Sequence, residues 1–272
     1  MDDAFLRIFM GGDIFSDAGI DVIEKKLKNL RQKYSIDFVI CNGENASGGN
    51  GLLEKDAIRI FKAGVDVITG GNHIFEKRDG YPFLATEKRV LRPQNYPSGV
   101  SILIEGEEET PGRGFDFFEC NGKKIAVLNL QGREYMAASL DCPFRTAASC
   151  AKQAAESDAL LFIDFHAESN EEKEALALFL DGKAVAVCGT HTHVQTADER
   201  ILPKGTAYIT DLGMSGVADS VIGSDAEIVI KRNLMQVLYK MENAVGETVI
   251  QGAIITVDKG KNCAISIERI QF

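Results

Sequence analysis

The N-terminal part of the chain alternates between short apolar runs and amphipathic segments, and this alternation restricts the fold more than any other feature. Apolar runs at 6–10, 38–41 and 65–69 predict strands. Between them, apolar residues recur with a helical period over 20–34 and 54–63. A strand–helix–strand order favours parallel strands joined by crossover helices. Functional groups of such sheets gather where the strands end.

Each of these three strands is predicted to end in a loop that carries side chains able to bind metal. Gly11-Gly12-Asp13 breaks the first apolar run, and Asn42-Gly43-Glu44-Asn45 follows the second. Gly70-Gly71-Asn72-His73 follows the third. Since the carboxyl ends of parallel strands share one edge of a sheet, these loops are expected to lie together.

The rest of the chain predicts a hairpin, two more helices and further strands. The Asn121-Gly122 turn joins 115–120 to 125–130 as a hairpin. Ser169, with Glu172 three residues later, opens a helix over 169–180 in a capping-box pattern. The other predicted elements are a helix at 145–157, strands at 159–165 and 184–188, and antiparallel strands at 207–210, 249–257 and 264–270, the last two joined by a turn at 258–260.

These elements predict an α/β fold in one domain over residues 1–272, a mixed sheet or a two-sheet sandwich flanked by helices. The chain is 45% hydrophobic and 26% charged, which is typical of globular proteins and supplies enough apolar residues for a full core. The sequence contains no evident repeat or linker. The acidic run at 107–109 is interpreted as a solvated loop.

The net charge of −10 argues against binding to long nucleic acids, because an acidic surface repels the phosphate backbone. It does not exclude a small anionic substrate, since bound metal ions can set the local potential. No apolar run is long enough for a membrane span, and no secretory signal is evident, so we expect a cytoplasmic protein. The six cysteines form no CxxC pair and are expected to be reduced. The oligomeric state is left open, with a homo-oligomer among the options.

Gly189-Thr190-His191-Thr192-His193 follows the apolar run at 184–188 and holds two of the four histidines. Neutral imidazole is a common metal ligand, and residues i and i+2 of an extended segment point to the same side. The other two histidines, His73 and His166, also follow predicted strands. We therefore expect the stretch 189–193 to close a two-metal site.

The proposed ligands combine carboxylates, amides and imidazoles. A dinuclear site needs a bridging carboxylate, further oxygen donors and several imidazoles. Mixed nitrogen and oxygen ligands without thiolate favour Mn, Fe, Ni or Zn. The candidate metal ligands are Asp13, Glu44, Asn45, Asn72, His166, His191 and His193, with His73 beside them.

Each candidate has a plain structural alternative when it is considered alone. Asp13 could be a turn or cap residue, and Asn42-Gly43 could be a simple turn. Asn72 could cap a helix, and a single histidine after a strand could be a hydrogen-bonded structural group. The metal interpretation rests on the whole set, because all four histidines of the chain fall in loops at strand ends.

The order of these motifs resembles the calcineurin-like metallophosphoesterase superfamily, and most closely its bacterial YmdB-like branch. The resemblance covers nearly the whole chain. It rests on Gly-Asp at 12–13, Gly-Asn-His at 71–73 and four longer segments. These are Asn42-Gly43-Glu44-Asn45-Ala46, Asn129-Leu130-Gln131-Gly132-Arg133, Asp164-Phe165-His166-Ala167-Glu168 and the run 189–216.

The resemblance implies a ligand partition and a compensation. In the superfamily a histidine stands two residues after the first acid, and here that residue is Phe15. The resemblance implies that Glu44 and Asn45 offset this loss, with Glu44 bridging two metals. Asp13, Glu44, Asn45 and His193 would hold one metal, and Glu44, Asn72, His166 and His191 the other. Departures at 16–18, 74–75 and Gln94 bear on substrate selectivity rather than metal binding.

The branch hydrolyses cyclic nucleotides, so the resemblance implies a phosphodiesterase for 2′,3′- and/or 3′,5′-cyclic nucleotides. Its cofactors would be two divalent or trivalent ions, Fe or Mn first and Zn or Ni as alternatives. A metal-bridging hydroxide would attack phosphorus, and His73 would stabilise or protonate the leaving group. Arg133 and Arg113 are candidate phosphate contacts. Two alternatives stay open: a phosphomonoesterase or nucleotidase with the same site, and a metal-binding regulator without enzymatic activity.

Overall fold

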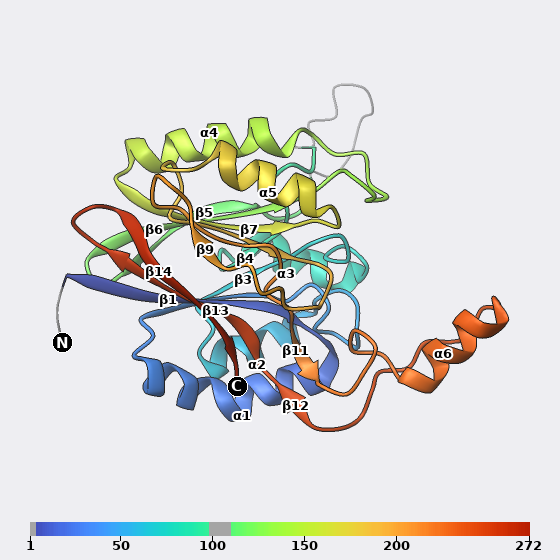
Figure 1. Cartoon of the computed structure of the whole chain (residues 1–272). Helices are drawn as coiled ribbons and strands as arrows, with labels where there is room; N and C mark the ends of the chain where they lie inside the picture. Colours follow the sequence, from blue (N-terminus) through green and yellow to red (C-terminus); the bar gives the residue numbers. More distant parts are fainter. Residues whose placement is uncertain (1–3, 98–109) are drawn as a thin grey trace.

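The computed structural model describes residues 4–97 and 110–272 and contains two β-sheets stacked face to face, with helices on both outer faces (Figure 1). The predicted α/β sandwich of mixed sheets is therefore confirmed. The predicted loop at 107–109 lies outside the described residues. The single domain over residues 1–272 stays a prediction.

The first sheet is built on the N-terminal strand. Its order is β12-β11-β1-β2-β3-β4, and β13 and β14 continue it as an antiparallel pair from β1. The neighbours of β1 on both sides of this order, β2 and β11, run parallel to it. The strands are β1 (Phe5–Ile14), β2 (Phe38–Asn42), β3 (Val67–Thr69), β4 (Val90–Leu91), β11 (Met214–Val217), β12 (Thr248–Val249), β13 (Gln251–Asp258) and β14 (Cys263–Gln271).

The second sheet has the order β5-β6-β7-β8-β10-β9. The predicted hairpin is confirmed as the antiparallel pair β5–β6, whereas β6, β7 and β8 run parallel. Its strands are β5 (Phe115–Cys120), β6 (Lys123–Gln131), β7 (Ala159–His166), β8 (Ala186–Thr190), β9 (Arg200–Ile201) and β10 (Ala207–Ile209).

The helices complete a four-layer arrangement. Figure 1 shows α1 (Ser16–Tyr34) and α2 (Glu54–Ala63) on one outer face, and α4 (Pro143–Glu156) and α5 (Asn170–Phe179) on the other. One buried apolar cluster lies between the sheets, and two others join each sheet to its helices. The short α3 (Tyr81–Thr86) follows a 3-10 turn at Arg78–Gly80, and α6 (Ala226–Met235) extends away from the body.

Two predictions about strands are wrong. Gly11 and Gly12 do not end the first strand, because β1 runs through them to Ile14. A side chain at Gly12 would collide with the backbone of Gly213, so glycine here permits a close approach of two chain segments. The predicted antiparallel strand at 207–210 is β10, which pairs parallel with β8 and antiparallel only with β9.

The parallel strands bring their carboxyl ends to one edge of the sandwich. β1, β2 and β3 of the first sheet end there, as do β7 and β8 of the second. The loops that follow these strands therefore meet between the two sheets. All six cysteines are free thiols. Among the described residues, no helix combines the length and apolar character needed to cross a bilayer.

Candidate metal centre

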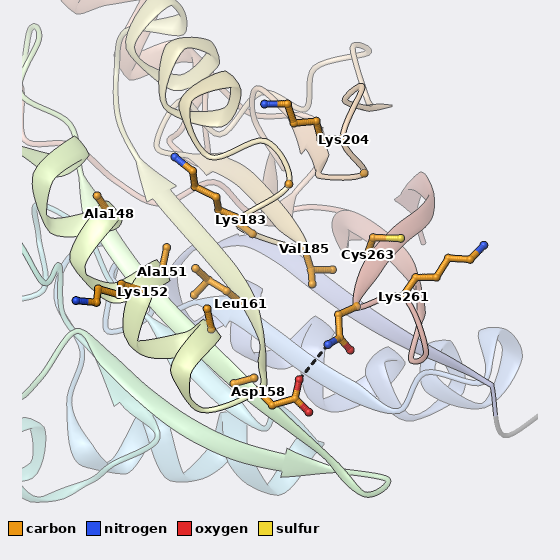
Figure 2. Close-up of a pocket in the computed structure, with 16 residues that line it drawn as sticks. Ala148, Ala151, Lys152, Asp158, Leu161, Lys183, Val185, Lys204, Lys261 and Cys263 are labelled. Atoms are coloured by element: carbon orange, nitrogen blue, oxygen red, sulfur yellow. Dashed lines mark hydrogen bonds between the residues drawn. The ribbon is translucent and has the colours of Figure 1, made fainter.

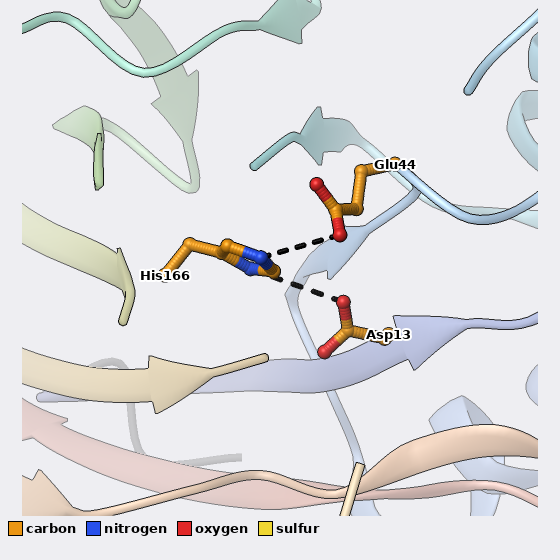
Figure 3. A group of neighbouring side chains, drawn as sticks. All are labelled: Asp13, Glu44 and His166. Atoms are coloured by element: carbon orange, nitrogen blue, oxygen red, sulfur yellow. Dashed lines mark ion pairs between the residues drawn. The ribbon is translucent and has the colours of Figure 1, made fainter. Parts of the chain in front are cut away.

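The structure places all eight predicted site residues at the carboxyl ends of five strands. Asp13 belongs to β1 and His166 ends β7. Figure 3 shows that His166 points from one sheet toward the carboxylates of Asp13 and Glu44 on the other. Ligand atoms of these three buried residues lie within 4.8 Å of one another. The remaining candidates follow the strands directly: Glu44 and Asn45 after β2, Asn72 and His73 after β3, and His191 and His193 after β8.

Three of these residues converge around the Nε2 atom of His166, which is the fourth donor of the group. The Oδ1 atom of Asn72 lies 2.9 Å from it, Nδ1 of His191 3.0 Å, and Oε1 of Glu44 3.2 Å. Ligand atoms bound at usual metal distances are separated by about 3.0 to 3.4 Å around one cation. The four donors therefore have the mutual spacing of a single coordination sphere.

A second group adjoins the first through Glu44. Oδ1 of Asp13 lies 3.8 Å from Nε2 of His193. Nδ2 of Asn45 lies 3.0 Å from Oε1 of Glu44 and 3.2 Å from Nε2 of His193. The amide of Asn45 thus presents its nitrogen to this group. A 180° rotation of the Asn45 side-chain amide would instead present its oxygen, which is the amide atom that binds cations.

The Asp13 carboxylate provides a test of whether the residues fit a cation. Its Oδ1 atom is fully buried and accepts a hydrogen bond from no described residue. The imidazole nitrogens of His193 and His166 lie 3.8 and 3.9 Å away, beyond hydrogen-bonding distance. A buried carboxylate oxygen without a donor is unfavourable, and a bound cation would compensate it. The donor set therefore fits a metal ion.

Burial and mutual charge shift the pKa values of this group strongly. Burial raises the pKa of Asp13 to about 6, against the opposing effect of the imidazoles. Burial alone would raise the pKa of Glu44, but the charge of His166 and its hydrogen bond lower it to about 2. Burial alone would lower the pKa of His166, but Glu44, Asp13 and Asp164 raise it to about 9. Burial and the charge of His166 lower the pKa of His191 to about 3.

The pKa shifts of His166 and His191 favour a proton on His166 at the position where the donor atoms would surround a cation. A pKa of about 9 favours the imidazolium form of His166 at neutral pH, and its Nε2 atom lies beside Asn72, Glu44 and His191. The low pKa of His191 favours its neutral form, whose Nδ1 atom can accept a hydrogen bond from Nε2 of His166. A metal ion at this position would displace the proton from His166 and take its place among the same donors.

A chain of hydrogen bonds that the sequence analysis did not predict orients His166. Its Nδ1 atom lies 3.0 Å from Oγ1 of Thr190, which donates to Oδ1 of Asp164 at 2.6 Å. Asp164 also accepts hydrogen bonds from Thr69 and Asn42. Such supporting contacts fix the ring and leave Nε2 free for a ligand role. The signal in the sequence was a carboxylate inside the apolar run that precedes His166.

His191 is oriented in a similar way, by a residue to which we had assigned no role. Its Nε2 atom lies 3.0 Å from Oε2 of Glu168, which leaves Nδ1 directed at His166. The backbone of His191 has φ of +110°, a conformation that non-glycine residues rarely adopt and that concentrates at functional sites. The buried Lys173–Asp211 ion pair supports the same loop, because Asp211 also accepts from the Thr192 amide.

Gly71 and Phe15 adapt the surroundings to this site. A side chain at Gly71 would collide with the Glu44 carboxylate and the His166 ring, so only glycine allows the two to approach. Phe15, which replaces the histidine common in the superfamily, packs edge-on against His193 with 5.4 Å between ring centroids. It therefore supports a ligand candidate instead of serving as one.

His73 is placed beside the site with its ring half-exposed. Its backbone amide donates to Oε2 of Glu44 at 2.8 Å, which ties this residue to the buried carboxylate. Among the described residues, the ring of His73 has a polar contact with Glu76, whose Oε1 atom lies 3.5 Å from Nδ1. The side chain of His73 is 39% exposed. The imidazole is thus free to meet a bound substrate.

The two arginines proposed as phosphate contacts make other interactions. Arg113 forms an ion pair with Asp116 at 3.0 Å, and the exposed Arg133 approaches Cys142. A separate cleft of about 590 Å³ lies where β7 begins, at the opposite end of the strand from His166 (Figure 2). Its rim carries Lys183 and Lys204, and none of the eight predicted site residues lines it.

Comparisons with known proteins identify relatives of this chain along nearly its whole length. A family model described as "YmdB-like protein" matches residues 9–270. A Bacillus subtilis (strain 168) protein named 2′,3′-cyclic-nucleotide 2′-phosphodiesterase is 43% identical over 265 residues, which cover 97% of this chain and 96% of that protein.

Solved structures give the same result for the fold. A hypothetical protein from Thermus thermophilus superposes with a TM-score of 0.87 at 35% identity, covering 98% of this chain and 99% of that one. A novel phosphatase from Mycoplasma pneumoniae superposes with a TM-score of 0.89 at 33% identity, covering 98% and 93% of the two chains.

Proposed function

The chain belongs to the YmdB-like protein family, and from that membership and the site geometry we propose that it is a dinuclear-metal phosphodiesterase that hydrolyses 2′,3′-cyclic nucleotides. The coarser assignment is an enzyme, a hydrolase of the phosphodiesterase or phosphatase type. The substrate class comes from the name of the Bacillus subtilis relative, at 43% identity.

The single observation that carries the two-metal proposal is the position of Glu44 between two donor groups. Its Oε1 atom lies 3.2 Å from Nε2 of His166 and 3.0 Å from the amide of Asn45. We propose that one ion is held by Glu44, Asn72, His166 and His191. A second would be held by Asp13, Glu44, Asn45 and His193, with Glu44 shared. The oxygen and nitrogen donors are compatible with Mn, Fe, Ni or Zn, and the resemblance to the family favours Fe or Mn.

When bound, such a pair of ions neutralises charge on a phosphodiester and lowers the pKa of water. The residues of the chain provide the rest. Asp164 acts through Thr190 to orient the imidazole of His166, and Glu168 orients that of His191 directly. Burial of Asp13 and Glu44 excludes water from the far side of the site.

His73 is proposed as the group that delivers a proton to the leaving oxygen. Hydrolysis adds one water to the cyclic diester, breaks the bond between phosphorus and the 2′ oxygen, and leaves a 3′-phosphate. The 2′ oxygen must gain a proton, and an imidazole is suited to donate it near neutral pH. The half-exposed ring and the amide tie to Glu44 support this assignment.

A substrate panel tests the proposal. The protein, loaded anaerobically with Mn or Fe, would be given 2′,3′-cyclic nucleotides, 3′,5′-cyclic nucleotides, nucleoside monophosphates and an aryl phosphodiester. We expect the 2′,3′-cyclic substrates to be hydrolysed fastest and phosphorus NMR to identify a 3′-phosphate. Preferential hydrolysis of the monophosphates would support the phosphomonoesterase alternative instead. Lack of turnover on every substrate, with metal bound, would support a regulator.

A further inference from the structure

We propose that the cleft where β7 begins, here called the lysine cleft, binds a small organic polyphosphate. Its volume of about 590 Å³ lies within the range of about 300 to 1,000 Å³ that is typical of small-molecule sites. Its walls come from α4, the segment 158–161, the turns at 182–185 and 204–205, and the hairpin turn at 261–263. Four of its sixteen lining residues are lysines: Lys152, Lys183, Lys204 and Lys261.

The charge of the lysine cleft is opposite to that of the chain as a whole. The chain has a net charge of −10, whereas the cleft combines four lysines with one acidic residue, Asp158. The carboxylate of Asp158 is already engaged, because Oδ1 accepts a hydrogen bond from Asn262 at 3.1 Å and Oδ2 lies 3.9 Å from Nζ of Lys123. The cleft therefore concentrates positive charge on an acidic protein, which favours an anionic ligand.

The ammonium groups of the lysine cleft are available to a ligand. Nζ of Lys183 donates only to a backbone carbonyl, that of Phe179, at 3.3 Å. Among the described residues, the ammonium group of Lys204 forms no hydrogen bond or ion pair. Lys152 and Lys261 form ion pairs of 3.8 and 3.6 Å, and their side chains are 78% and 75% exposed. Because exposed pairs of this kind contribute little, all four lysines can turn to a bound anion.

The lining of the lysine cleft indicates a ligand with both phosphates and an apolar group. Lysine binds phosphate as a point charge. Four lysines and one aspartate leave a charge of +3, which a polyphosphate can balance and a single phosphate, with a charge of about −2, cannot. Figure 2 shows the lysines around the apolar side chains of Leu161 and Val185, and three alanines of α4 also line the cleft. An organic polyphosphate, such as a nucleoside triphosphate, matches both features.

The position of the lysine cleft separates its ligand from the substrate of the metal centre. Ala159, the first residue of β7, lines the cleft, whereas His166 ends the same strand. A strand of eight residues spans more than about 20 Å, so the two sites lie at opposite ends of the sheet. The lysine cleft is therefore a second site, and binding there does not depend on the proposed phosphodiesterase activity.

Cys263 provides a readout that is specific to the lysine cleft. Its half-buried thiol lines the cleft, whereas the half-buried Cys142 does not and serves as an internal control. The full-length, metal-loaded protein would be alkylated with iodoacetamide, with and without the β,γ-methylene analogue of ATP, which resists hydrolysis. Peptide mass spectrometry would follow both cysteines. We expect the analogue to slow alkylation of Cys263 at least tenfold and to leave that of Cys142 unchanged.

A pair of double variants tests the lysines. Lys183→Glu/Lys204→Glu should raise the concentration of analogue that half-protects Cys263 at least tenfold. The matched control, Lys25→Glu/Lys55→Glu, makes the same change of charge at exposed positions of α1 and α2 and should bind like wild type. Unchanged melting temperatures would verify that both variants fold.

A second pair of variants tests the apolar wall. Ala148→Trp fills the cleft without changing its charge and should also weaken binding at least tenfold, whereas Ser149→Trp, at the next residue of α4, should not. Tripolyphosphate, which has no apolar group, should protect Cys263 less than the analogue does, and adenosine should protect it least. No protection at millimolar analogue, equal protection by adenosine, or unchanged binding to Lys183→Glu/Lys204→Glu would overturn the proposal.

Discussion

The candidate metal centre and the projecting segment at 222–245 differ in which side chains they bury. In the centre, charged residues such as Asp13 and Glu44 are buried. In the segment at 222–245, apolar residues such as Leu234 and Leu238 are exposed. Each region places side chains in surroundings that disfavour them. The buried carboxylates of the first region fit a cation, whereas the apolar side chains of the second face solvent.

The largest expected effect is at the carboxylate shared by the two donor groups. Glu44→Gln keeps the size of the side chain and removes its charge, so both cations should bind poorly. We expect turnover to fall on the order of 10³-fold or more. Metal analysis and turnover would be measured together. The matched control is Glu119→Gln, at an exposed position of β5, which should change neither, and a metal-replete Glu44→Gln would refute the bridging role.

The next effect separates chemistry from metal binding. His73→Ala should lower turnover by about 10²-fold, because proton transfer to the leaving oxygen is lost. Metal content should not change, since only the backbone amide of His73 contacts the metal ligands. An aryl substrate with a good leaving group should be less affected than a cyclic nucleotide. Loss of metal from this variant would instead assign His73 a structural role.

A smaller effect is expected from the residue that orients His191. Glu168→Ala removes the acceptor 3.0 Å from Nε2, so the ring can adopt the wrong tautomer. Metal affinity should fall by about 10- to 100-fold. Isothermal titration with Mn²⁺ would measure it, with Glu168→Asp as the conservative comparison. Equal affinities in wild type and Glu168→Ala would show that Glu168 does not support the site.

The smallest effect concerns pH. Without metal, the pKa of His166 is raised from 6.5 to about 9. The protonated ring therefore stabilises the folded state fully at pH values below 6.5, and this contribution is lost as the pH rises through 9. Metal must displace that proton, so affinity should rise about tenfold per pH unit between 7 and 8. Titrations at several pH values, with proton release in weak buffer, would measure this. An affinity that is constant across this range would contradict the assignment.

The sequence predicted which residues would converge, because these residues follow strands whose ends must meet. Asp13, Glu44, Asn72, His166 and His191 each stand directly after or at the end of an apolar run. Parallel topology then brings them together without any knowledge of tertiary distances. Their roles as ligands stay predictions, although their convergence is now observed.

The supporting residues could not be assigned in the same way. Glu168 and Thr190 act through contacts across the site, and sequence spacing does not reveal which ring each one meets. The extension of β1 through Gly11 and Gly12 depended on the packing of Gly213, which is distant in the sequence. Glycine at such a position resembles a turn unless the neighbouring backbone is known.

The projection of α6 from the body was not predicted, for a different reason. Its apolar residues, including Ile230 and Leu234, resemble ordinary core positions in the sequence. Only the structure shows that they lie outside the body. A helix that projects from the body cannot be distinguished in the sequence from a packed one, because the same pattern of apolar residues normally predicts intramolecular burial.

The most direct test of the central claim is anomalous diffraction from crystals grown with Mn²⁺. The account predicts two peaks per chain, about 3.5 to 4 Å apart, with the Glu44 carboxylate contacting both. One peak lies near Asn72, His166 and His191, and the other near Asp13 and His193. A single peak, or two peaks that do not share Glu44, would contradict the account.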